Sequence, residues 1–238
     1  MRKWDACGLI PGQPCHQDDD STPGFMVKRE TDDVESFVRA LRFVCSDTGV
    51  CNGKIGLVGG SSGATHAAWV ILNTNPTPND DWPHWFENGH DDRPDCAALL
   101  SGTYDFSDRT PASYPPGHDP LPEFIQAVEN YTRTGDLTAQ KQFSPVYLVA
   151  APNEDLPFKP LLMINSQYDH PVPSYQIQDM VCALESVGIS QTLYQTMTIS
   201  DSSEHSSSYW SSYDGQRCLG PCKDVAADVT AFLDAHLK

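Results

Sequence analysis

The residues best suited to chemistry in this chain begin with a serine set between glycines, Gly59-x-Ser61-x-Gly63. A short apolar run, 55–58, precedes this motif, and a run of small and apolar residues, 64–72, follows it. A serine on a sharp strand-to-helix turn is held outward above the end of a sheet. Its neighbours must be glycines, because a Cβ would collide with the adjacent strand or helix. The motif in this context predicts that Ser61 is a nucleophile.

A serine hydroxyl becomes a good nucleophile only when a base takes its proton, and a third group must orient that base. Two later loops could supply these groups. Asp169 follows an apolar strand predicted at 160–164, and His205 lies in a polar loop after a strand predicted at 192–199. We therefore expect Asp169 to be the orienting acid and His205 the base.

Other assignments remain open at this stage. Ser61 could occupy a plain helix-capping turn, and Asp105, which also follows a predicted strand, is an alternative acid. His170, next to the proposed acid, is expected at the rim, and His66 is expected to be a packing residue on the helix behind the serine. Three further histidines, in acidic or proline-rich loops, lack the spacing of metal ligands, so no metal site is predicted: His84, His90 and His118.

The elements that must position these residues alternate between strands and helices. Strands are expected at 54–58, 96–100, 160–164 and 192–199, and helices at 32–45, 62–73, 121–131, 174–187 and 223–236. Short apolar strands alternating with amphipathic helices predict an α/β fold with a mainly parallel sheet covered on both faces. We expect one three-layer domain over 1–238, with an irregular segment at 1–30 and an insertion or cap region at 103–156.

The first helix is predicted from the spacing of its apolar residues and from a capping motif at its N-terminus. Apolar residues at helical spacing mark one face of it, namely Val34, Phe37, Val38, Leu41 and Val44. Asp32 and Glu35 fit a capping box at its beginning. Before it, 24–28 could form one short strand.

Several short motifs together resemble the esterase and lipase group of the α/β-hydrolase superfamily, near carboxylesterase-like and hemicellulose-side-chain esterases. They span about residues 32–236 and comprise the helix at 33–44, Gly59 to Gly63, Leu100 to Asp105, Phe143 to Pro145, Asp169-x-x-Val172-Pro173, and His205. The order Ser61, Asp169, His205 is also the order of that superfamily. The resemblance implies a nucleophile, acid and base in that order, with no cofactor.

The resemblance also implies how a carbonyl oxygen would be held. The N–H of Ser62 would point to the forming oxyanion at the positive end of the following helix, with Gly60 beside it. Trp210 and Tyr104, together with Trp82 and Trp85, are weaker candidates for lining the substrate pocket. The family's His-Gly-Gly-Gly-type loop has no counterpart here, and the early strands of the usual sheet are expected to be absent, so the fold should be abbreviated at its N-terminal edge.

The net charge and the length of the apolar runs limit the kinds of molecule that this protein is expected to bind. The 238-residue chain carries a formal net charge of −17, which repels phosphate backbones and makes nucleic acid an unfavourable partner. Apolar runs fall short of the ~20 residues that a membrane helix needs. We expect a carboxylic ester hydrolase acting on a small-molecule ester. A non-catalytic hydrolase-like binding or scaffold domain is the alternative, and the oligomeric state is left open.

The spacing of the cysteines indicates whether the protein is expected in an oxidising cellular compartment. Six of the eight cysteines form three pairs close in sequence: 7/15, 45/51 and 218/222. Such pairs favour local disulfides over zinc and favour a secreted or periplasmic location, although no signal peptide opens this chain. Cys96 and Cys182 lie in apolar contexts typical of buried thiols.

Overall fold

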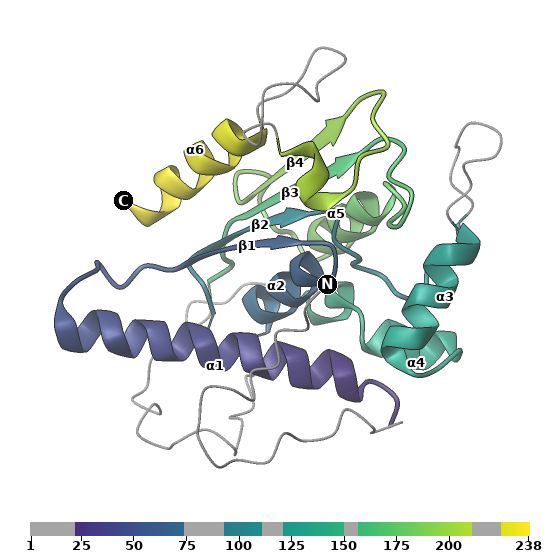
Figure 1. The fold of residues 1–238 in the computed structure, drawn as a ribbon, viewed down its shortest axis with the longest axis horizontal. Coiled ribbons are helices and arrows are strands. Elements are labelled where there is room, and N and C mark those ends of the chain that lie inside the picture. Colours follow the sequence, from purple (N-terminus) through teal and green to yellow (C-terminus); the bar gives the residue numbers. More distant parts are fainter. Residues whose placement is uncertain (1–21, 74–92, 111–120, 150–156, 211–224) are drawn as a thin grey trace.

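The computed structural model describes residues 22–73, 93–110, 121–149, 157–210 and 225–238 (Figure 1). Four parallel strands form one sheet in the order β1-β2-β3-β4. The strands are β1 (Gly56–Gly60), β2 (Cys96–Leu100), β3 (Leu161–Ser166) and β4 (Tyr194–Ile199). Because all four run the same way, their carboxyl ends meet at one edge of the sheet, where ligands bind in open α/β folds.

Burial along the strands follows from their position in the sheet. Every residue of β2 and β3 is buried, which explains why β2 and the first four residues of β3 are continuous apolar runs rather than alternating ones. β4 is an edge strand of the described sheet and exposes half of its residues. No described strand pairs with the other side of β1, so β1 is the second edge strand of the described sheet.

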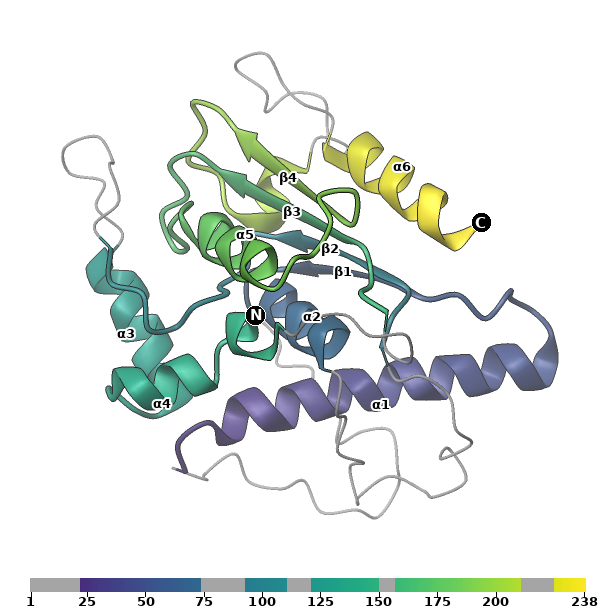
Figure 2. The same ribbon diagram turned by 180° about the vertical axis from the view of Figure 1, so that it is seen from behind.

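Helices cover both faces of the sheet and complete three layers (Figures 1 and 2). On one face, α2 (Ser62–Leu72) and α5 (Gln176–Ser186) pack with β2 and β3 around a core that includes Leu99, Met163 and Met180. On the other face, α6 (Val225–Leu237) packs through Val229 and Phe232. The long helix α1 (Phe25–Thr48) lies outside α2. The predicted fold class is confirmed.

The start of α1 corrects the sequence analysis. The helix begins at Phe25, not near Asp32, so 24–28 is not a strand and Asp32 lies within the helix. Gly24 precedes α1 with φ 77°, and no side chain caps the helix. Residues 26–30 include good helix formers, and Val27 is buried against Phe106 and Phe124, so tertiary packing extends the helix.

The buried face of α1 also differs from the predicted one. Val38 is buried as predicted, but Phe37 and Val44 are 56% and 45% exposed, and the polar residues Thr31 and Glu35 are buried instead. Glu35 accepts a hydrogen bond from Asn73 Nδ2 at 2.7 Å, at the end of α2. The helical period is right, but the buried face is shifted from the predicted one toward Thr31 and Glu35, which make polar contacts with His66 and Asn73.

The region after β2 contains two helices and a 3-10 turn within the described residues. These are α3 (Leu121–Thr132), α4 (Leu137–Gln142) and η3 (Pro145–Leu148); α4 and η3 were not predicted from the sequence. Asp136 caps α4 by accepting from the N–H groups of Thr138 and Ala139. Phe124 and Val128 of α3 pack with Val27 near the beginning of α1. Whether this region acts as a cap remains a prediction.

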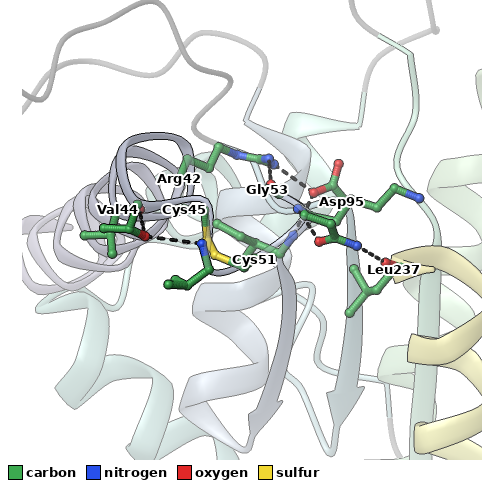
Figure 3. The surroundings of a disulfide bond; sticks show 12 residues. Arg42, Val44, Cys45, Cys51, Gly53, Asp95 and Leu237 are labelled. Atoms are coloured by element: carbon green, nitrogen blue, oxygen red, sulfur yellow. Dashed lines mark hydrogen bonds and ion pairs between the residues drawn. A yellow bond between two sulfur atoms is a disulfide. The ribbon is translucent and has the colours of Figure 1, made fainter.

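At the amino ends of the strands, a disulfide joins Cys45 to Cys51 and so ties α1 to the segment before β1 (Figure 3). Nearby, the Arg42 guanidinium donates to the carbonyl of Gly53 at 2.8 Å and to Asp95 Oδ2 at 3.1 Å. Asn52 Nδ2 donates to the carbonyl of Leu237 at 2.6 Å, which connects this end of the sheet to α6.

The disulfide confirms one of the three predicted cysteine pairs, while the pairs 7/15 and 218/222 lie outside the described residues. Cys96 is a buried thiol, as expected, and burial raises its pKa to about 11. Cys182 is exposed on α5, so its predicted burial is wrong. Its apolar sequence neighbours Val181 and Leu184 pack against the core, whereas Cys182 lies on the exposed side of α5.

Candidate active site

Ser61 occupies the turn between β1 and α2, with a left-handed φ of 56° and ψ of −125°. This conformation is strained for a residue with a side chain, and such strain is common at functional sites. Gly59 makes the turn possible. A Cβ at Gly59 would lie 2.2 Å from the carbonyl oxygen of Gly63 and 2.7 Å from the backbone nitrogen of Ala64. The close approach of α2 therefore requires glycine at position 59, as the motif predicts. At Gly63 an added Cβ would meet no atom within 4 Å, so the prediction that this glycine also avoids a collision is wrong.

Asp169 and His205 are in direct contact. His205 Nδ1 lies 2.9 Å from Asp169 Oδ1 and 3.0 Å from Oδ2, and the carboxylate is fully buried. Asp169 Oδ1 also accepts from the N–H of Val172 at 3.0 Å. A buried carboxylate with fixed donors can hold an imidazole in one orientation and favour the tautomer that carries its proton on Nδ1.

The loop after β4 reaches back across the sheet toward β1. The N–H of Ser206, next to His205, donates to Ser101 Oγ at the end of β2 at 2.9 Å. A Cβ at Gly60 would lie 2.1 Å from Ser206 Oγ, so the Ser206 side chain sits directly over the backbone that precedes Ser61. The predicted nucleophile, acid and base therefore extend from neighbouring parts of the same sheet edge.

Ser62 begins α2 and is exposed. The N–H groups of a helix's first turn have no partner within the helix, and the helix dipole makes this end attractive to negative charge. The carbonyl of Ser61 accepts from the N–H of Ala64 at 3.0 Å, which fixes the start of the helix immediately after the serine. This arrangement suits the oxyanion role expected for Ser62.

The alternative histidines have other environments. His66 is buried behind the serine, where Tyr131 Oη lies 2.6 Å and Glu30 Oε2 lies 2.7 Å from its Nε2. It is a packing histidine, as expected. His170 is partly exposed and pairs with Glu123 at 3.2 Å. His84, His90 and His118 lie outside the described residues.

Asp105, the alternative acid, faces a different group. Its Oδ1 accepts from both the N–H and the hydroxyl of Ser107, at 2.8 and 2.6 Å. It also contributes to the negative surroundings of Asp179, whose pKa burial raises to about 8, with Asp108 and Asp105 adding to the rise. The geometry thus favours Asp169 over Asp105 as the partner of His205.

The aromatic residues suggested for the pocket have core positions. Tyr104 is fully buried with the core formed by α2, α5 and the sheet, and its ring lies beneath Gly102. Trp210 is partly buried against the opposite cluster, which includes Leu100 and Phe232. Tyr104 is therefore a core residue rather than a pocket wall, whereas the expected place of the partly exposed Trp210 at a substrate pocket remains a prediction. Trp82 and Trp85 lie outside the described residues.

The described residues offer neither a metal site nor a membrane-spanning helix. They contain no group of three or more His, Cys, Asp or Glu side chains arranged to hold a metal ion. Among the helices found in them, none is both long and apolar enough to cross a membrane.

Two serines at this edge were missed by sequence reasoning, Ser101 and Ser206. Both have positive φ, 53° and 54°, and both are buried. The position of Ser101 directly after a buried strand was the available signal, since side chains at the carboxyl ends of parallel strands gather at one edge. Ser206 had no local signal beyond its place next to His205.

No protein-family model matches the sequence, and no curated protein matches it at a significant level. Solved structures do match. An acetyl ester-xyloside bifunctional hydrolase from Caldicellulosiruptor lactoaceticus matches with a TM-score of 0.58 and 17% identity, over 85% of this chain and 64% of that one. A thermophilic esterase from Thermogutta terrifontis, with butyrate bound, matches with a TM-score of 0.56 and 18% identity, over 88% and 66% of the two chains.

The same Thermogutta terrifontis esterase, phosphonylated by sarin, matches with a TM-score of 0.57 and 17% identity, over 90% of this chain and 66% of that one. The chain has the fold of these esterases. It spans about two thirds of their length. The resemblance expected from the motifs is confirmed at the level of the fold.

Proposed function

We propose that this chain is a serine hydrolase that cleaves carboxylic esters through an acyl-enzyme. The observation that carries the proposal is the contact between His205 Nδ1 and the buried Asp169 carboxylate, at 2.9 Å, at the sheet edge where Ser61 turns into α2. A strained serine and an oriented imidazole are the two parts that such a reaction requires. The fold shared with esterases supports the proposal.

In the proposed acylation step, the Ser61 hydroxyl oxygen attacks the ester carbonyl carbon while His205 takes the hydroxyl proton. Asp169 keeps the second ring nitrogen of His205 protonated and stabilises the imidazolium that forms. Collapse of the tetrahedral intermediate breaks the carbonyl–alkoxy bond. The proton passes from His205 to the leaving alcohol, and the acyl group remains on Ser61.

In the proposed deacylation step, water replaces the alcohol. His205 removes a proton from the water, which attacks the acyl carbon, and the same proton then returns to Ser61 as the acid leaves. The N–H of Ser62 would donate to the oxyanion in both steps, with the Gly60 backbone beside it. Removing one donor of this kind costs on the order of 10²–10³ in rate, so any further donor matters greatly. The proposed reaction uses no metal or cofactor.

Short acyl esters are the proposed substrate class. The matched structures include an acetyl ester hydrolase and an esterase with butyrate bound, both with small acyl groups. In this chain, Tyr104 is fully buried in the core, so its ring does not form an apolar wall for a long acyl chain. We further propose an oxidising location, secreted or periplasmic, on the basis of the disulfide between Cys45 and Cys51.

The decisive experiment is intact mass after incubation with a fluorophosphonate, on wild type, Ser61→Ala and Ser186→Ala. Ser186 is an exposed serine near the end of α5 and serves as the matched control. We expect one adduct on wild type and on Ser186→Ala, and none on Ser61→Ala. Hydrolysis of p-nitrophenyl acetate and butyrate should show the same pattern.

The alternative, a non-catalytic hydrolase-like binding or scaffold domain, makes the opposite prediction. A folded wild-type chain would then give no adduct and no hydrolysis above that of Ser61→Ala. That result would overturn the proposed function. An adduct that persists in Ser61→Ala would also overturn it, because another nucleophile would then be responsible.

A further inference from the structure

Ser101 is the first residue after β2, at the same sheet edge as Ser61 and Asp169. Its side chain is fully buried, and its N–H donates to the carbonyl of Ile164 in β3 at 2.8 Å. The Ser101 hydroxyl lies 2.6 Å from Asp169 Oδ2. A hydrogen bond this short, from a hydroxyl to a carboxylate, is of the stronger, charge-assisted kind.

The same hydroxyl has a second partner. The N–H of Ser206 donates to Ser101 Oγ at 2.9 Å, across 105 positions of sequence. Asn165 Oδ1 lies 3.1 Å from the hydroxyl, but it already accepts from the N–H of Ser166 at 2.9 Å. A hydroxyl has one proton to donate, and the closer, charged Asp169 oxygen is the better acceptor. The hydroxyl therefore donates to the acid and accepts from the residue next to the base.

This double contact joins two separate segments around the contact between Asp169 and His205. Ser101 Oγ, at the end of β2, donates to Asp169 and accepts from the N–H of Ser206, the residue next to His205. Ser206 in turn places its side chain over Gly60, next to Ser61. One buried hydroxyl thus fixes the loop after β4 relative to both the acid and the serine turn.

Backbone strain points to the same group of residues. Five non-glycine residues in the described part of the chain have positive φ, and three of them are Ser61, Ser101 and Ser206. Strained conformations persist where surrounding contacts over-determine them, and they gather at functional sites. For Ser101 and Ser206, the hydrogen bonds of the Ser101 hydroxyl with Asp169 and with the Ser206 N–H are contacts of this kind.

We infer that Ser101 is a positioning residue that holds Asp169 and the His205 loop in register for the proposed reaction. This inference rests on the function proposed above. Without the hydroxyl, Asp169 loses a short hydrogen bond and the N–H of Ser206 loses a buried acceptor. The imidazole is then held less firmly, which lowers the rate of proton transfer without removing any group that binds the ester.

The test uses Ser101→Ala and Ser101→Gly in the full chain, with Ser107→Ala as the matched control. Both substitutions of Ser101 remove the hydroxyl, but glycine also relieves the strain of a positive φ. Ser107 donates to Asp105 Oδ1 at 2.6 Å, so the control removes a serine-to-aspartate hydrogen bond of equal length away from His205. Three readouts are needed: thermal unfolding, kcat and KM on p-nitrophenyl acetate, and the low-field Nδ1–H proton resonance of His205.

We expect both Ser101 variants to fold, to lose about 10- to 100-fold in kcat with little change in KM, and to lose or broaden the Nδ1–H resonance. Ser107→Ala should match wild type in all three. Unchanged kcat, or an intact resonance in both folded variants, would overturn the inference. Recovery of activity in Ser101→Gly alone would also overturn it, because strain and not the hydroxyl would then be the cause.

The resonance separates the two proposals. If wild type forms no fluorophosphonate adduct, the proposed function fails, yet loss of the resonance in Ser101→Gly would still show that the hydroxyl holds the Asp169–His205 contact. If wild type is active and the resonance survives in the variants, only the inference about Ser101 fails. Should Ser101→Ala not fold, Ser101→Gly provides the same measurements.

Discussion

Asp169 contacts Nδ1 of His205 through both carboxylate oxygens, at 2.9 and 3.0 Å, although 36 positions separate the two residues in sequence. The contact forms because β3 and β4 are adjacent and parallel, so the loops that follow them leave the same edge of the sheet. The carboxylate is fully buried, whereas the imidazole is partly exposed. The acid is thus fixed inside the protein, and the base can reach a substrate.

Replacing Asp169 with asparagine should abolish most of the proposed activity. The side chain keeps its shape but loses its charge, and its amide can favour the wrong tautomer of His205. We expect a loss on the order of 10⁴-fold in kcat. The measurement is steady-state hydrolysis of p-nitrophenyl acetate, together with the rate of fluorophosphonate labelling.

Asp105→Asn is the matched control for this prediction, because Asp105 was the alternative acid. Its carboxylate accepts from Ser107, so its charge is not used to orient His205 in the described structure. We expect kcat to change by less than about threefold, well within 1 kcal/mol. A larger loss in Asp105→Asn than in Asp169→Asn would reverse the assignment of the acid.

Gly59→Ala should prevent the serine turn from forming. The added Cβ would lie 2.2 Å from the Gly63 carbonyl oxygen, and the atoms it meets are backbone, which cannot swing aside. Overpacking of this kind costs about 1–3 kcal/mol or more, and we expect a lower unfolding midpoint and no labelling at Ser61. Urea unfolding followed by circular dichroism measures the effect.

Gly63→Ala is the control for the same turn. A Cβ at Gly63 would meet no atom within 4 Å, and the residue lies in the first turn of α2. Alanine is the better helix former by about 0.5–1 kcal/mol. This variant should be as stable as wild type or slightly more so; equal destabilisation by both alanines would refute the steric explanation.

Replacing both Cys45 and Cys51 with serine should lower stability and leave chemistry intact. The disulfide closes a short loop, with a sequence separation of 6, at the amino ends of the strands (Figure 3). The chain-entropy model gives about 2 kcal/mol for a loop of this size. We expect the urea midpoint to fall under non-reducing conditions while kcat at low temperature stays at the wild-type value. An unchanged midpoint would show that the bond does not stabilise the fold.

Asp179→Asn should change how stability depends on pH. Burial, with Asp108 and Asp105 nearby, raises the pKa of Asp179 to about 8 in the folded protein. The unfolded chain releases this proton near pH 4, so Asp179 contributes most to stability below that pH, and its contribution falls until the pH reaches about 8. Because asparagine does not titrate, the variant lacks this loss of stability with rising pH.

The measurement is the thermal midpoint of wild type and Asp179→Asn between about pH 5 and about pH 9. The thermal midpoint of Asp179→Asn should rise relative to that of wild type as the pH increases, and the difference between the two midpoints should become constant above about pH 8. Gln176, which donates to Asp179 Oδ2 at 3.2 Å, can still donate to the asparagine oxygen. A difference between the two proteins that does not vary with pH would contradict the prediction.

The sequence by itself determined the alternation of elements and the motif around Ser61. β2 and most of β3 were predictable because central parallel strands are buried on both faces and therefore consist largely of continuous apolar runs. The turn at Ser61 was predictable because close packing of α2 on β1 admits only glycine at position 59. The candidates Asp169 and His205 followed from their places after predicted strands. These features depend on residues that are close together in the sequence, so a short stretch of sequence is enough to predict them.

Tertiary structure alone decided the contacts between distant segments. It selected the buried face of α1, started that helix at Phe25, placed Tyr104 in the core and packed Trp210 against the opposite cluster. It also brought Ser101 to Asp169 and Ser206 to Gly60. The physical reason is that such contacts depend on how loops fold back across a sheet, where one hydrogen bond or one close approach chooses among conformations that the local sequence leaves nearly equal in energy.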